Sequence, residues 1–277
     1  MTVIAHVSDL HLTPVPFPIG EGLKPALGWI NWARKPGAHD NAIGERTLAA
    51  IAAARPDHVA LTGDLIELGL ASEYAAAGAA LAELGDPDRV SWAPGNHDVY
   101  TRRAEQRLQA VLGDWLSLPV GAGDLRARFP SVALAGRAAV VTLCSGTPTW
   151  LFSAEGELGR DQLARLDALL DGLDRTAHLP VIAVHHPPHA PGLSRLKRLR
   201  DGEALMALLA RHGCPLVLHG HLHRACDTVW TGGARTISLA GAPSASAAGR
   251  HGDDPAGFTL VHVDADLGFR LERRTLP

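Results

Sequence analysis

Short apolar runs that end in polar turns recur along the first hundred residues and predict buried strands. They cover 2–7 and 58–62, and a third enters the turn at 95–98. Between them, 42–54 and 72–84 carry apolar residues at helical spacing. Asn41 stands where a helix cap is expected. This alternation of strand and helix predicts a parallel α/β sheet with its polar turns gathered at the carboxyl edge.

The second half of the chain predicts another, partly antiparallel sheet. Gly136-Arg137 separates two strands of a hairpin, and a leucine stripe predicts an amphipathic helix over 160–173. Thr101 is expected to cap a helix that ends at Leu112. The remaining expected elements are strands at 131–134, 138–143, 180–184 and 215–218, a helix at 202–212, and strands near 227–231, 234–239, 258–263 and 268–272. We expect the last four strands to complete the second sheet.

The segment 13–40 interrupts this regularity. Five prolines divide it, and an apolar patch with Trp29 and Trp32 precedes the basic Arg34-Lys35. It predicts a loop with one short helix, which is either a lid beside the site or a segment packed on the core without a role in substrate choice. Because no repeat and no linker divides the chain, we expect residues 1–277 to form a single domain with this insertion.

Composition limits the classes of partner. The net charge is −3, so there is no basic excess of the kind that binds nucleic acid polymers. No apolar run approaches the ~18–20 residues of a transmembrane helix, and the first residues lack a secretion signal, which favours a cytoplasmic location. Three cysteines without close pairing are typical of reduced thiols. The basic stretch 195–200 is either a solvated face or a contact for substrate phosphate or a membrane surface.

Five predicted strands end in aspartate, asparagine or histidine, and the chain holds fifteen histidines. The turns are Asp9-x-His11, Gly63-Asp64, Gly95-Asn96-His97-Asp98, His185-His186 and His219-Gly220-His221-x-His223. Each one alone has an ordinary interpretation as a helix cap or a surface histidine. On an extended backbone Asp9 and His11 point to the same face, and Gly95 allows a sharp turn. Together the five turns favour a metal site, since these side chains bind zinc, manganese and iron.

This ordered set of turns resembles the calcineurin-like metallophosphoesterases, from Asp9 to His223. The resemblance implies two mixed β-sheets packed as a sandwich and flanked by helices, with a site for two divalent cations of manganese, iron or zinc. It implies that Asp9, His11 and His223 bind the first cation, that Asn96, His185 and His221 bind the second, and that Asp64 bridges them. In the family the residue matching His97 contacts substrate, and Asp98 is expected to orient it.

The roles of other side chains near these turns remain open. His185 is preferred to His186 as a ligand because the first of the pair is nearer the strand end in relatives. His186 is expected either to support the ligands or to face substrate. His189, Arg224 and His39 are further candidates for substrate contacts.

The resemblance implies a phosphohydrolase in which a hydroxide activated by two cations attacks phosphorus. A phosphodiesterase acting on small phosphodiesters is the leading interpretation. One alternative, motivated by the Trp29/Trp32 patch and the basic stretch 195–200, is a pyrophosphatase acting on a nucleotide-linked lipid of the UDP-diacylglucosamine type, which would allow peripheral contact with a membrane. A phosphomonoesterase and a non-catalytic scaffold are weaker alternatives. Oligomeric state is left open.

Overall fold

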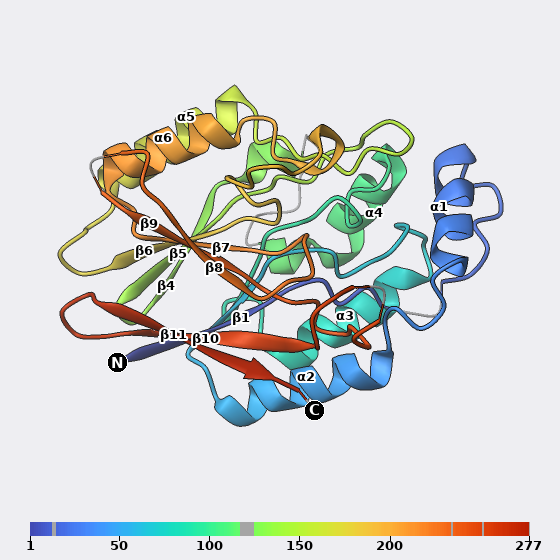
Figure 1. Ribbon diagram of the computed structural model, residues 1–277, viewed down its shortest axis with the longest axis horizontal. Helices are drawn as coiled ribbons and strands as arrows, with labels where there is room; N and C mark the ends of the chain where they lie inside the picture. Colours follow the sequence, from blue (N-terminus) through green and yellow to red (C-terminus); the bar gives the residue numbers. More distant parts are fainter. Residues whose placement is uncertain (13–14, 117–124, 234, 251, 277) are drawn as a thin grey trace.

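The computed structural model describes residues 1–12, 15–116, 125–233, 235–250 and 252–276. Two β-sheets pack against each other, and helices cover their outer faces (Figure 1). In spatial order the first sheet contains β11 (Phe269–Thr275), β10 (Gly257–Val263), β1 (Thr2–Val7), β2 (His58–Leu61) and β3 (Val90–Trp92). The second contains β4 (Ser131–Ala135), β5 (Ala138–Thr142), β6 (Leu179–Ala183), β7 (Leu216–His219), β9 (Ile237–Gly241) and β8 (Cys226–Trp230). Both sheets are mixed, which confirms the predicted fold class.

The helices lie close to the predicted positions. They are α1 (Leu23–Ala33), α2 (Asn41–Ala54), α3 (Glu73–Leu84), α4 (Arg102–Leu112), α5 (Arg160–Gly172) and α6 (Gly202–His212), and the short 3₁₀ turns are η1 (Gly113–Leu116), η2 (Leu125–Arg128) and η3 (Arg195–Lys197). Thr101 caps α4 as predicted, since its hydroxyl accepts from the Ala104 N–H. At α2 the cap is Asp40 rather than Asn41, because the Asp40 carboxylate accepts from the Ala42 N–H at 2.9 Å. None of the described helices is long and apolar enough to cross a membrane.

The last two strands join the first sheet, so the prediction that they complete the second sheet is wrong. β10 runs antiparallel to β1, with Thr2 opposite Val263, and β11 pairs with β10. Every residue of β10 is buried, so this strand needs cover on both faces as well as partners on both edges. Between β1 and β11 it has a partner on each edge, and its side chains pack in a core on each face. β8 and β9 do join the second sheet; Ala234, the first residue of the strand expected at 234–239, lies outside the described residues.

The space between the sheets is filled by small and branched apolar side chains, among them Ile4, Val140, Leu218 and Val261. Along β6 the side chains alternate: Val181 and Ala183 point between the sheets, whereas Ile182 packs in the separate core that contains residues of α5 and α6. A third core lies between the first sheet and α2, α3 and α4. The central strands of each sheet are therefore buried on both faces, which fixes their register.

The parallel pairing brings the polar turns to one edge of the two sheets. β1, β2 and β3 run parallel in one sheet, and β5, β6 and β7 run parallel in the other. The pairing continues past the strands, since the N–H of Asp9 donates to the Gly63 carbonyl and the N–H of Gly220 donates to the His185 carbonyl. α1 lies beyond this edge (Figure 1), and Trp29 and Trp32 pack there against Leu68 in the loop that follows β2. Residues 13 and 14 of the predicted insertion lie outside the described part.

The position of β10 gives a stability prediction. Leu260 on β10 is 4% exposed and belongs to the core beneath the helices of the first sheet. We expect Leu260→Ala to lower the free energy of unfolding by about 2–5 kcal/mol, because it removes apolar contacts and leaves a cavity. Leu134→Ala on β4, where the leucine is 62% exposed, should change it by less than about 0.5 kcal/mol. Urea unfolding of both variants makes the comparison. Equal effects would contradict the buried position of β10.

Candidate metal centre

The seven side chains that the resemblance assigns to cations converge at this edge in two groups. In the first, the Oδ1 atom of Asp9 lies 3.7 Å from Nε2 of His11 and 3.4 Å from Nε2 of His223. The two Nε2 atoms are 3.2 Å apart. These three side chains come from turns after β1 and β7, so the first group joins the two sheets.

The second group surrounds His185, at the end of β6. Its Nε2 atom lies 3.2 Å from Oδ1 of Asn96 and 3.2 Å from Nδ1 of His221. The Oδ2 atom of Asp64 is 3.2 Å from the same nitrogen and 3.9 Å from Nε2 of His11 in the first group. The Asp64 carboxylate thus lies between the two groups.

The backbone at these positions adopts an uncommon conformation. Asp9, His11, Asp64, His221 and His223 all have positive φ, between 42° and 71°. Residues other than glycine seldom occupy this region, because it is strained for them. Five such residues at one site lower the stability of the fold, and the strained backbone places their side chains. The expectation that Asp9 and His11 share a face of an extended strand was therefore wrong in its geometry, because β1 ends at Val7 and a left-handed turn brings the two side chains together.

Two glycines allow the turns to approach so closely. A Cβ atom on Gly95 would collide with the Asp64 carboxylate and the His185 ring. One on Gly220 would collide with the side chains of Ser8 and Asp9. The φ angle of Gly95 is not positive, so this residue serves close packing and not the sharp turn that the sequence predicted.

Three of the four histidines in the two groups bond through their other ring nitrogen to an acceptor. Nδ1 of His11 contacts the Glu67 carboxylate at 2.7 Å, Nδ1 of His223 contacts Asp253 at 3.3 Å, and Nδ1 of His185 contacts the Thr62 carbonyl at 2.7 Å. Such acceptors fix the tautomer, so the lone pair of Nε2 is directed to the centre of the site, as in histidines that bind metals.

Glu67 was not predicted from the sequence. It is buried, and His97 and His11 together outweigh the effect of burial and lower the pKa of its carboxyl to about 2. Its one sequence signal is that, besides Asp64, it is the only acidic residue in the apolar stretch 58–72.

Burial and opposite charges act against each other on the pKa values of the site. Burial raises the pKa of Asp64, but the imidazoles of His185 and His97 outweigh it and hold that pKa well below its usual range. Burial lowers the pKa of His185, yet Asp64 reverses this and raises it to about 9. The pKa of His221 falls to about 3 through burial and the neighbouring His185. The site thus holds ionised carboxylates next to several imidazoles, an environment that favours cations.

The donor set fits two divalent cations. Carboxylate, amide and imidazole groups together are ligands of borderline hardness. Within the described residues, Oδ1 of Asp9 is buried without a hydrogen-bond partner, although it points at two imidazole nitrogens. A buried carboxylate oxygen without a donor is costly, and a cation between these atoms would remove that cost.

His97 lies beside the two groups and is more exposed than they are. Its Nδ1 atom contacts the Glu67 carbonyl at 2.6 Å, and its ring stacks on Tyr100 with centroids 5.7 Å apart. Nδ1 must donate in the first contact, because a carbonyl only accepts. Lys24, from α1, donates to the Tyr100 and Thr149 carbonyls at 2.8 and 2.9 Å. The segment 15–40 is therefore tied to the loop that carries His97.

Asp98 does not take the expected position beside the His97 ring. Its fully buried carboxylate accepts backbone N–H groups from Asp64, Leu65 and Gly95 at 2.8–2.9 Å, and from Ile66 at 3.2 Å. The sequence could not show this, because three of the four donors belong to a turn more than thirty residues earlier. Asp98 holds the two turns together and so positions Asp64.

The three predicted substrate residues differ in position. His186 is fully buried, and its two nitrogens contact the Ser145 hydroxyl at 2.8 Å and the Ala154 carbonyl at 3.1 Å. This places it behind His185 and His221, in a supporting position, and not at the open face. His189 and Arg224 are exposed.

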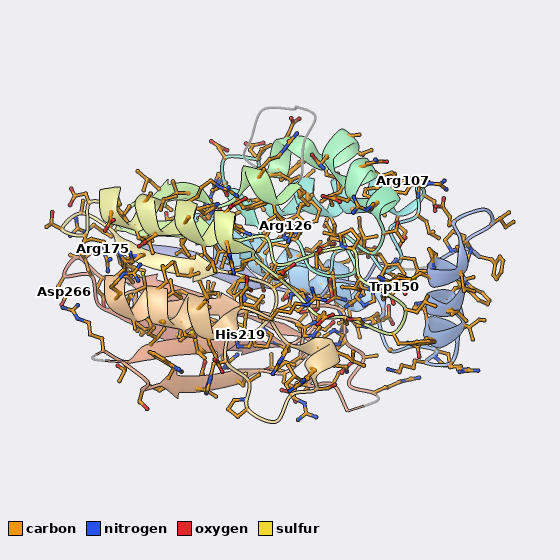
Figure 2. The ribbon with its side chains drawn as sticks, turned by 90° about the horizontal axis from the view of Figure 1, so that it is seen from above. Arg107, Arg126, Trp150, Arg175, His219 and Asp266 are labelled. Carbon is orange, nitrogen blue, oxygen red and sulfur yellow. The ribbon has the colours of Figure 1, made fainter. Side chains whose placement is uncertain are left out.

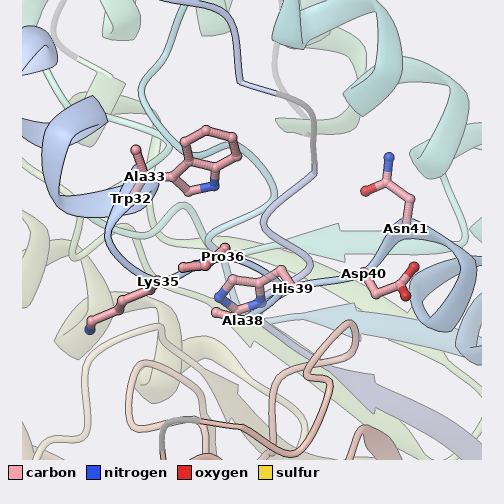
Figure 3. A pocket seen from close by; sticks show the side chains of 9 residues that line it. Trp32, Ala33, Lys35, Pro36, Ala38, His39, Asp40 and Asn41 are labelled. Atoms are coloured by element: carbon pink, nitrogen blue, oxygen red, sulfur yellow. The ribbon is translucent and has the colours of Figure 1, made fainter.

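His39 brings the insertion into the site. Its ring centroid is 4.4 Å from that of His11 and 5.3 Å from that of His223, and Nδ1 contacts the Ser246 hydroxyl at 3.0 Å. His39 also lines a cavity of about 510 Å³ with Trp32, Lys35 and Pro36 (Figure 3). A cavity thus adjoins the first group of ligands.

The sequence pattern of calcineurin-like phosphoesterases matches residues 2–225. The chain belongs to this family. Two curated relatives are described as "probable cyclic nucleotide phosphodiesterase". The one from Synechococcus sp. is 29% identical over 78% of this phosphoesterase and 76% of the relative. The one from Rhodococcus erythropolis is 30% identical over 76% and 67%.

Solved structures share the fold of this phosphoesterase at low sequence identity. A dimetal phosphatase from Danio rerio aligns with a TM-score of 0.67 at 15% identity, over 99% of this chain and 96% of that one. A purple acid phosphatase from yellow lupin aligns with a TM-score of 0.60 at 12% identity, over 99% of this chain and 51% of that one. These similarities establish the fold of the phosphoesterase and leave its substrate open.

The bonds of Asp98 give a prediction. In Asp98→Asn the new amide group would face backbone N–H donors, leaving at least one of them without an acceptor. We expect the free energy of unfolding to fall by about 1–3 kcal/mol. Asp88→Asn, at an exposed position, should change it by less than about 0.5 kcal/mol. Chemical denaturation measures both, and an unchanged Asp98→Asn protein would show that the four bonds do not hold the turns.

Proposed function

We propose that this phosphoesterase is a dinuclear metal-dependent phosphodiesterase that hydrolyses small phosphodiesters. The observation that carries the proposal is the position of Asp64, within 4 Å of imidazole nitrogens in both groups of side chains. A bridging carboxylate is what two neighbouring cations require. Such a pair would lower the pKa of a water molecule and draw charge from the phosphate oxygens.

The residues of the chain have separate tasks in this proposal. Asp9, His11 and His223 would hold one cation, and Asn96, His185 and His221 the other, with Asp64 shared. His97 keeps Nδ1 bonded to the Glu67 carbonyl, so its Nε2 atom is the one available to the substrate. It would stabilise charge on the phosphate or donate a proton to the leaving oxygen.

Two observations favour a diester over a monoester. Both curated relatives described above are named as probable phosphodiesterases. In addition, the cavity lined by Trp32 and His39 gives room for an organic group beside the first group of ligands. A diester carries a second organic group on phosphorus, which this cavity would accept.

Metal removal tests the proposal. We expect a chelator to abolish hydrolysis of bis(p-nitrophenyl) phosphate and added Mn²⁺ to restore it, because the carboxylates and imidazoles of the site would hold the ions. The diester should react faster than p-nitrophenyl phosphate under the same conditions. Activity that a chelator leaves intact would reject the metal requirement, and a faster monoester would reject the diesterase.

Replacing His97 tests its separate role. We expect His97→Ala to lower kcat by about 10²–10⁴ while the metal content, measured by elemental analysis, stays unchanged. The loss should be larger for a diester with an alkyl leaving group than for one with p-nitrophenol, which leaves without a proton. His178→Ala, before the amino end of β6, is the control and should retain full activity. Loss of metal in His97→Ala would identify His97 as a ligand.

A further inference from the structure

Two large aromatic side chains project from the loop that connects β5 to α5. Trp150 is 87% exposed and Phe152 is 81% exposed. Phe152 has a φ of 64°, a conformation that bulky residues rarely adopt. Exposure of a tryptophan and a phenylalanine to water is unfavourable. Neighbouring exposed aromatic side chains therefore mark a site of contact with another molecule.

Basic residues lie directly beside these aromatic groups. The N–H of Ala154 donates to the Leu196 carbonyl at 2.8 Å, and that of Gly156 donates to the Arg198 carbonyl at 3.1 Å, so the loop runs along η3. We call the following six residues the rim patch: Trp150, Phe152, Leu196, Arg195, Lys197 and Arg198. All six are exposed.

The rim patch holds three basic side chains and no acidic one, although Arg200 and Arg198 help to lower the pKa of the neighbouring Glu155. Within the described residues, Arg195, Lys197 and Arg198 make no ion pair, whereas Arg200 next to them pairs with Glu155. An overall charge of −3 makes this gathering of three cations a local feature. The patch therefore combines exposed aromatic groups with positive charge.

The rim patch lies at the border of the metal centre. The Ala154 carbonyl contacts Nε2 of His186, behind the ligands. Thr149, next to Trp150, accepts from Lys24 of α1, and Trp150 lies toward α1 in Figure 2. Leu23, beside Lys24, is 64% exposed and extends the apolar surface. Whatever the rim patch binds would lie close to the metal centre.

We propose that the rim patch docks this phosphoesterase on the surface of an anionic phospholipid bilayer. Tryptophan and phenylalanine insert at the level of the lipid headgroups, and lysine and arginine bind anionic headgroups, so one surface meets both chemical requirements. Each basic residue strengthens such binding by about fivefold, the equivalent of about 1 kcal/mol. The proposal concerns where the enzyme is held and does not depend on the substrate of the metal centre.

Vesicle flotation without substrate tests the proposal. The 277-residue protein should float with vesicles of phosphatidylcholine mixed with phosphatidylglycerol, and much less with phosphatidylcholine alone. The double variant Trp150→Ala/Phe152→Ala should bind at least about tenfold more weakly, because it loses the inserted groups. Lys197→Gln/Arg198→Gln should lose about 25-fold on the mixed vesicles and most of the preference for anionic lipid.

The controls separate docking from misfolding and self-association. Val132→Ala/Leu134→Ala removes exposed apolar groups from β4 and should bind as the original protein does. Thermal unfolding of every variant verifies that it is folded. Absence of vesicle binding by the original protein, or equal binding by folded Trp150→Ala/Phe152→Ala, would overturn the proposal. So would a patch-dependent dimer in gel filtration that does not bind vesicles.

Discussion

The carboxylate of Asp64 between two groups of imidazoles is the interaction on which the rest of the site depends. A buried carboxylate is stable only where positive charge or hydrogen-bond donors surround it. Here His185 lies 3.2 Å from its Oδ2 atom, and the His97 N–H donates to its Oδ1 atom at 2.9 Å. One oxygen is thus fixed by the backbone while the other faces the ring nitrogens, which gives the carboxylate a single orientation.

The fold supplies the rigidity that this carboxylate needs. The turns around it depart from common backbone geometry at five positions, and such strain persists only where the surrounding structure leaves no alternative. The two sheets provide that constraint, because their central strands are buried on both faces and their parallel strands end at the same edge. Asp98, in the turn after β3, adds a local constraint, because it accepts three backbone bonds from the turn after β2 and a fourth from Gly95 in its own turn. Core packing far from the site therefore determines where Asp64 lies.

The sequence predicted the parts of the molecule that depend on neighbours along the chain. Strands such as Thr2–Val7, the helix Gly202–His212 and the convergence of polar turns followed from local patterns. The partners of β10 did not follow from local patterns, since an apolar strand fits either sheet. Its place beside β1 depends on the packing of the two complete sheets. Likewise Glu67 and the contacts of Asp98 depend on atoms that are distant in sequence. The residue types at the site were thus predictable, and the bonds that orient them were not.

This difference also explains why the reaction is easier to infer than the substrate. The ligands stand on strand ends, where spacing along the chain reveals them. The surfaces that would meet the rest of a substrate come instead from the segment 15–40, which supplies His39, the Trp32 cavity and the Lys24 contact with Thr149. That segment carries no periodic pattern, and it obtains its position from bonds to Tyr100 and Ser246 on other loops. Contacts with distant loops, which no local sequence pattern reveals, therefore place this segment beside the metal centre.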